Sequence, residues 1–125
     1  MSGAQLENAQ VLGADGTFRP GAVILTDGVF GGEEDAAAVV ERFDATGLWL
    51  TPGFVDVHTH LAWRAFDAAE RRHLTPAEQA RDVRLNAGRT LAAGVTGIRD
   101  AGGLTAPLAQ EVGGLRAALS VQMLG

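Results

Sequence analysis

The first fifty residues consist of short apolar runs separated by residues that favour turns. Asp15-Gly16, Pro20-Gly21 and Asp27-Gly28 are the turn signals, and the last of these predicts a tight hairpin. The runs are too short for helices and are bounded by glycine, which is typical of β-strands. Strands are therefore expected at residues 6–12, 22–26, 29–30 and 39–43.

The pattern changes after residue 50, where strands begin to alternate with helices. Residues 54–60 form a β-rich run that becomes polar at its C-terminal end. A helix is predicted to start after Thr75, because Thr75 and Glu78 form a capping box, and to end at Gly94. A strand follows at 95–100. Strand, helix and strand in this order are the crossover unit of a parallel sheet.

The remaining residues give weaker signals. A helix is expected within 105–112. Residues 117–124 are apolar enough for a strand or a helix, and periodicity does not separate the two; we expect a strand.

Composition limits the possible partners. The net charge is −5, and the basic residues are scattered, so a nucleic-acid partner is not expected. The sequence has no run of 18 apolar residues, which argues against a membrane span. The chain has no cysteine, and all ten basic residues are arginine, so a metal site here would use nitrogen or oxygen ligands. We expect a cytoplasmic protein that acts on a small molecule.

The candidate chemistry lies at His58 and His60. Side chains two positions apart on a strand share a face, about 6.6 Å apart along the backbone, so the two imidazoles can approach one metal ion. A catalytic zinc site needs at least a third protein ligand and an open position for water. The pair is also compatible with two ordinary histidines that bind no metal.

Two carboxylates are candidates for supporting roles. Asp56 shares the face of His58 and is predicted to orient the metal ligands or pack beneath them, or else to be a buried, hydrogen-bonded carboxylate. Asp100 ends the next strand and is a candidate to contact a ligand imidazole, a metal-bound water or the substrate, or else to cap the turn that follows. His73 lies just before the helix cap and is given no role.

Residues 44–60, DATGLWLTPGFVDVHTH, closely resemble the signature of the amidohydrolase superfamily. The likeness extends to residues 21–28, which are similar to the N-terminal β-sandwich of that family. Residues 92–103, AAGVTGIRDAGG, are similar to the second barrel strand of the imidazolonepropionase-like and Xaa-Pro dipeptidase-like branch. The deaminase and dihydropyrimidinase-like branches share the His-x-His strand and are the weaker match.

The resemblance implies an α/β fold in which an incomplete β-sandwich segment, residues 1–50, precedes the first βα units of an incomplete (β/α)8 TIM barrel, residues 51–125. It also implies hydrolysis of a carbon-nitrogen bond, in a cyclic amide, an amide or a dipeptide-like substrate, by water activated on one or two divalent metal ions, expected to be Zn²⁺. His58 and His60 would be metal ligands. The further ligands, among them a glutamate or carboxylated lysine, two histidines and an aspartate, and the catalytic residues would lie beyond Gly125.

A barrel of this kind needs about 250 residues, so we expect the 125 residues to be an inactive fragment when alone. A complementing C-terminal half or a second copy of the chain would then be its partner. The alternative is a non-catalytic interaction module whose histidines are structural.

Overall fold

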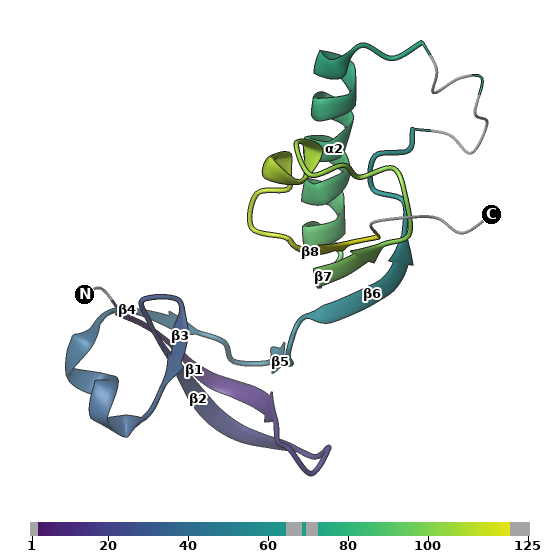
Figure 1. Cartoon of the computed structure of the whole chain (residues 1–125). Coiled ribbons are helices and arrows are strands. Elements are labelled where there is room, and N and C mark those ends of the chain that lie inside the picture. Colours follow the sequence, from purple (N-terminus) through teal and green to yellow (C-terminus); the bar gives the residue numbers. More distant parts are fainter. Residues whose placement is uncertain (1–2, 65–68, 70–72, 121–125) are drawn as a thin grey trace. The chain divides into compact units, whose positions relative to one another are not determined.

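The chain forms two compact units, Met1–Pro52 and Gly53–Gly125 (Figure 1). The structure is a computed structural model that describes residues 3–64, 69 and 73–120. Within these ranges no helix is both long and apolar enough to span a bilayer.

The N-terminal unit is a mixed sheet centred on its first strand. The strand order is β3-β2-β1-β4, and β5 also pairs with β1. β1 is antiparallel to β2 and parallel to β4 and β5. The bounds are β1 Gly3–Leu12, β2 Phe18–Thr26, β3 Val29–Gly31, β4 Val39–Asp44 and β5 Trp49–Leu50, with a 3-10 helix at Glu33–Ala38 before β4.

The turns of this unit follow the sequence signals, with one exception. Asp27 and Gly28 both have positive φ, 52° and 80°, and connect β2 to β3 as the tight hairpin that was predicted. The prediction of a turn at Pro20-Gly21 is wrong, because both residues lie inside β2 and pair with β1. β3 pairs with β2 only from Ile24 onward, so β2 has a free edge at Pro20, where a missing N–H is tolerated.

Among the described residues, the C-terminal unit holds a parallel sheet in the order β6-β7-β8 and the long helix α2 (Figure 1). The elements are β6 Phe54–Thr59, α2 Pro76–Ala92, β7 Val95–Asp100 and β8 Arg116–Leu119. Phe54 pairs with Val95 at one end of β6, and Thr59 pairs with Asp100 at the other. The carboxyl ends of these two strands therefore lie side by side, directly before His60 and Ala101.

The helix α2 begins and ends where the sequence predicts. Thr75 accepts a hydrogen bond from the Glu78 amide, and the Glu78 carboxylate accepts one from the Thr75 amide. This bonding lowers the pKa of Glu78. Gly94 follows the helix with φ 84°, a conformation that favours glycine. The mixed sheet of the N-terminal unit and the parallel sheet with α2 in the C-terminal unit agree with the predicted fold class. Closure into a barrel stays a prediction.

The end of the described chain differs in part from the expectation. The helix expected within 105–112 is only a 3-10 turn at Leu108–Glu111, because Pro107 precedes it and Gly113-Gly114 follow it closely. The strand expected at 117–124 is present as β8, which pairs with β7; residues 121–125 lie outside the described residues.

The core of this unit fills the space between the sheet and α2. Its buried members come from α2, β7 and the loops that follow β6 and β7: Leu61, Ala62, Val83, Ala87, Ile98, Leu104, Val112 and Leu115. Leu61 directly follows His60, and Leu104 lies four positions after Asp100 in the loop that follows β7. The hydrophobic core thus anchors both loops that carry the candidate site.

Candidate metal centre

His58 and His60 come together at the carboxyl end of β6. His58 is exposed on the strand, and His60 is half-buried just after it. Their ring centroids are 5.4 Å apart, and the ring planes are inclined by 79°. An ion about 2.1 Å from one nitrogen of each ring would hold the two ring centres about 5 Å apart in a tetrahedral site. The observed spacing therefore fits two ligands of one ion.

The ring of His60 is fixed on two sides. Its Nδ1 lies 2.9 Å from the carbonyl oxygen of Gly102, and its face stacks on Trp63 with centroids 3.7 Å apart and planes inclined by 7°. A carbonyl oxygen only accepts, so Nδ1 is the protonated nitrogen that donates. In a neutral imidazole this leaves the lone pair on Nε2, which is the arrangement found in metal-binding histidines.

Asp56 contacts the backbone next to the candidate ligands. Its Oδ1 accepts a hydrogen bond from the amide of His58 at 3.0 Å. Its side chain is exposed, so the alternative of a buried carboxylate is wrong. The bond fixes the local backbone from which the His58 ring projects. A direct role toward a metal ion or a substrate stays a prediction.

Asp100 is almost completely buried, with 1% of its surface exposed. Its Oδ2 accepts from the Leu61 amide at 2.7 Å, and its Oδ1 accepts from the amides of Gly102 and Leu104 at 2.9 Å and 3.2 Å. A buried carboxylate needs such donors to offset its desolvation. The structure thus places Asp100 on backbone amides of both loops; a contact with substrate or metal-bound water stays a prediction.

The described residues bring two candidate metal ligands together but form no complete site. No group of three or more His, Asp or Glu residues within 3–64, 69 and 73–120 is placed to hold a metal ion. The donor set that is present, two imidazoles, suits a borderline ion such as Zn²⁺. Further ligands would have to come from other residues.

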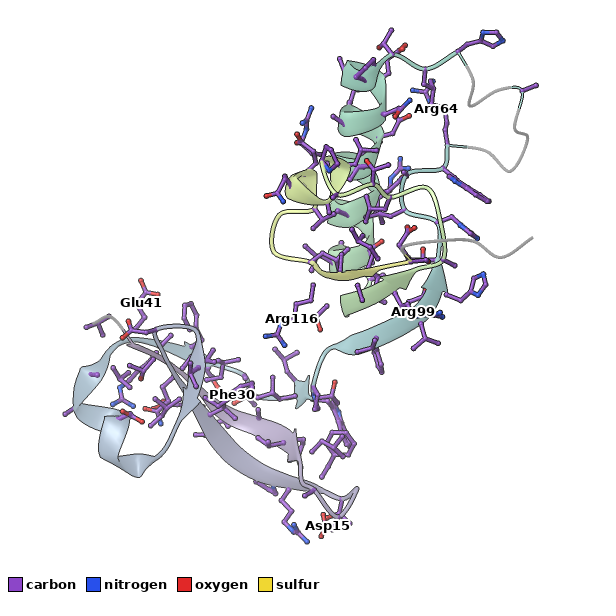
Figure 2. The ribbon with its side chains drawn as sticks, viewed as in Figure 1. Asp15, Phe30, Glu41, Arg64, Arg99 and Arg116 are labelled. Carbon is purple, nitrogen blue, oxygen red and sulfur yellow. The ribbon has the colours of Figure 1, made fainter. Side chains whose placement is uncertain are left out.

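An ion pair connects the segment after the site to α2. Arg64, labelled in Figure 2, donates from Nε and Nη2 to the two carboxylate oxygens of Asp82, at 2.8 Å and 3.1 Å. The hydrogen bonds to Asp82 raise the pKa of Arg64. This bidentate pair links Arg64, the residue directly after Trp63, to α2.

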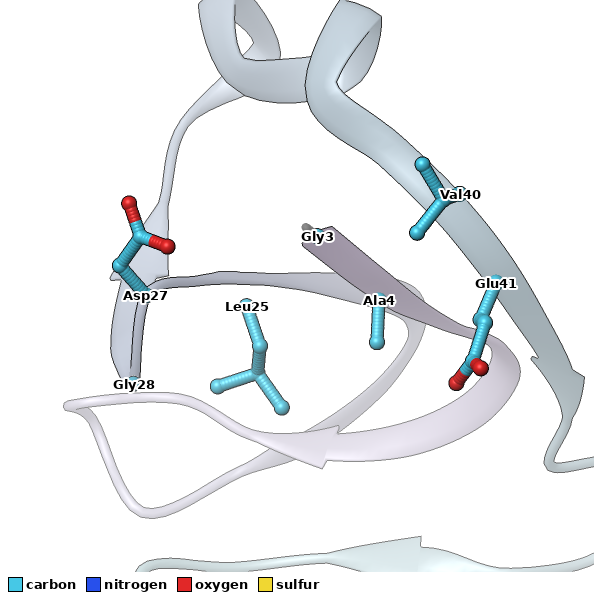
Figure 3. A pocket seen from close by; sticks show the side chains of 7 residues that line it. All are labelled: Gly3, Ala4, Leu25, Asp27, Gly28, Val40 and Glu41. Carbon is cyan, nitrogen blue, oxygen red and sulfur yellow. The ribbon is translucent and has the colours of Figure 1, made fainter. Parts of the chain in front are cut away.

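A separate cavity of about 330 Å³ lies in the N-terminal unit. Asp27 and Glu41 contribute carboxylates to its lining, and the other lining residues are small or apolar (Figure 3). No histidine lines it, so it is chemically unlike the site at His58 and His60.

Trp63 and the glycine that makes room for it, Gly103, were not among the predicted site residues. A Cβ on Gly103 would lie 2.3 Å from Nε1 of Trp63, and the backbone of Gly103 has φ 105°. The Trp63 amide also donates to the His60 carbonyl at 3.0 Å. An aromatic residue three positions after His60 was the available signal, but stacking cannot be predicted from spacing alone.

Replacing Gly103 with alanine is expected to destabilise the fold by about 2–4 kcal/mol, because strained backbone and a steric clash add. Gly113→Ala is the matched control: Gly113 has φ 62° but an open space where a Cβ would be, so only about 1 kcal/mol is expected. Urea unfolding of the complete protein, meaning the longest polypeptide that contains this sequence, measures both. Equal losses in the two variants would contradict the packing of Trp63 against Gly103.

Comparison with known proteins places these observations in context. No profile of a known protein family matches the chain. A dihydroorotase of Listeria monocytogenes is 45% identical over 58 residues, which are 45% of this chain and 14% of that protein. An imidazolonepropionase of Chromobacterium violaceum is 59% identical over 39 residues, which are 30% of this chain and 9% of that protein.

The fold is shared over a longer stretch. The crystal structure of an amidohydrolase matches 95% of this chain with a TM-score of 0.79 and 22% identity. The match covers 31% of that structure. The chain thus spans about a third of the length of this solved structure and about a seventh of the length of the dihydroorotase it matches.

Proposed function

We propose that this chain, which corresponds to the N-terminal portion of amidohydrolase-superfamily proteins, supplies two ligands to the divalent metal of a carbon-nitrogen hydrolase. The observation that carries the proposal is the tautomer of His60. Its Nδ1 donates a hydrogen bond to the Gly102 carbonyl, which leaves the lone pair of Nε2 for a metal. The centroids of the His58 and His60 rings are 5.4 Å apart. The names of the similar proteins support the same class of reaction.

The chain's own residues would hold the metal and keep its ligands in place. His58 and His60 would bind through neutral imidazole nitrogens. The Gly102 carbonyl accepts a hydrogen bond from Nδ1–H of His60, and Trp63 stacks on one face of that ring. The metal, once bound, would polarise the scissile carbonyl and activate a water molecule. Zn²⁺ is the ion we propose, because imidazole is one of its preferred ligands.

We further propose that the 125-residue chain is inactive alone and is completed by other parts of a (β/α)8 barrel. Its described residues hold only two histidine ligands in one place. The strand β6 also exposes apolar side chains, among them Phe54, Val55 and Val57, each about two-thirds exposed. Exposed apolar strands are covered in stable proteins, which supports a complementing portion of the polypeptide.

The test is the metal content and turnover of the complete protein. We expect one or two equivalents of divalent metal by mass spectrometry, and hydrolysis of at least one member of a panel of cyclic amides, linear amides and dipeptides. Chelation should remove the activity, and added Zn²⁺ should restore it. A purified protein without bound metal, whose hydrolysis is absent or insensitive to chelation, would overturn the proposal and favour an interaction module with structural histidines.

A further inference from the structure

The loop after β7 contacts the His60 ring through a backbone carbonyl group. Gly102 presents its carbonyl oxygen to Nδ1 of His60, while its amide donates to Oδ1 of Asp100. Its neighbour Gly103 has φ 105°, a value that side chains rarely adopt. The loop conformation that directs this carbonyl therefore depends on glycine and on Asp100.

The loop after β6 is attached to the same carboxylate. Oδ2 of Asp100 accepts from the amide of Leu61, the residue directly after His60. The carbonyl oxygen of Leu61 accepts from the side-chain amide of Asn86 in α2 at 2.9 Å. Leu61 is therefore fixed through both of its backbone polar groups, and the backbone that carries His60 is fixed with it.

We propose that Asp100 is a positioning residue for His60: by binding Leu61 and Gly102 together, it sets the ring direction and the tautomer in which Nε2 is free. The inference rests on the proposed function for its purpose, but its geometry concerns this chain alone. Hydrogen bonds to a carboxylate that is 1% exposed are strong, because water does not compete for them. The ring direction and the tautomer of His60 are thus set before any metal binds.

Asp100→Asn is the decisive substitution, because an asparagine has one acceptor oxygen and an amide group that donates. It cannot accept from Leu61 on one side and from Gly102 on the other. Asp44→Asn is the matched control. Asp44 also ends a strand, β4, and accepts from the amide and hydroxyl of Thr46 and from Asn8, but it lies in the other unit.

The first readout is the tautomer of His60 in the metal-free complete protein, from nitrogen NMR of histidine-labelled samples with His60→Ala as the assignment control. We expect the Nδ1–H form in the wild type and in Asp44→Asn, and a loss of that preference in Asp100→Asn. The second readout is amide exchange at Leu61, which should accelerate only in Asp100→Asn. The third is Zn²⁺ affinity, expected to fall about 10–100-fold in Asp100→Asn alone.

These outcomes separate the inference from the proposed function. A wild-type His60 in the Nε2–H form, or an Asp100→Asn protein with unchanged tautomer and unchanged exchange, would overturn the inference even in an active enzyme. A tautomer that depends on Asp100 in a protein that neither binds metal nor hydrolyses amides would support the inference and overturn the proposed function. If Asp100→Asn does not fold, the wild-type protein still tests the inference. The Nδ1–H form of His60 and slow amide exchange at Leu61 would support it, and the Nε2–H form or fast exchange would overturn it.

Discussion

Replacing His60 with alanine is expected to lower the affinity of the complete protein for Zn²⁺ by about 10²–10³-fold. Structural zinc sites with four ligands gain about 10–16 kcal/mol on binding, or about 2.5–4 kcal/mol for each ligand. The substitution removes one imidazole and also the ring that stacks on Trp63. Competition with a chelating dye measures the affinity, and turnover at saturating substrate should fall with metal occupancy.

His73→Ala is the matched control for this experiment. His73 is the third histidine of the chain, and it is exposed just before α2. The same change of side chain at this position should leave metal affinity and turnover within a factor of two, because surface substitutions away from a site have small effects. An equal loss in both variants, or a His60→Ala protein that retains its metal, would remove His60 from the site.

The features that the sequence predicted correctly depend on residues close to one another in the chain. Asp27-Gly28 makes a hairpin because both residues adopt positive φ. Thr75 and Glu78 start α2 because each satisfies the other's backbone amide. The rings of His58 and His60 lie 5.4 Å apart because strand residues two apart project to the same side, while their binding of a metal stays a prediction. Each of these features depends on residues that lie no more than four positions apart in the sequence.

The side-chain contacts of the candidate site that the sequence did not predict join residues far apart in the chain. Asp100 reaches Leu61 across 39 positions, and His60 reaches Gly102 across 42. Both contacts require the register in which Thr59 pairs with Asp100, and no local pattern fixes that register. The expected helix at 105–112 is short for a local reason, the close spacing of Pro107 and Gly113.

Leu104→Ala is expected to lower the free energy of unfolding by about 3 kcal/mol, within the range for buried leucines. Leu104 is 4% exposed in the core, and its amide donates to Asp100, so the cavity would open beneath the loop that presents Gly102 to His60. We therefore expect the loss of stability to be accompanied by weaker Zn²⁺ binding. Urea unfolding and metal competition on the complete protein measure the two effects.

Leu85→Ala provides the comparison for this last prediction, because Leu85 belongs to α2 of the same unit but is 48% exposed. The same truncation there should cost less than about 1 kcal/mol, since little apolar surface is lost from the core. Metal affinity should not change. A Leu104→Ala protein that loses stability as predicted and yet has the same metal affinity as Leu85→Ala would contradict a role of the core in presenting Gly102 to His60. The backbone hydrogen bonds to Asp100 would then be sufficient to hold the loop.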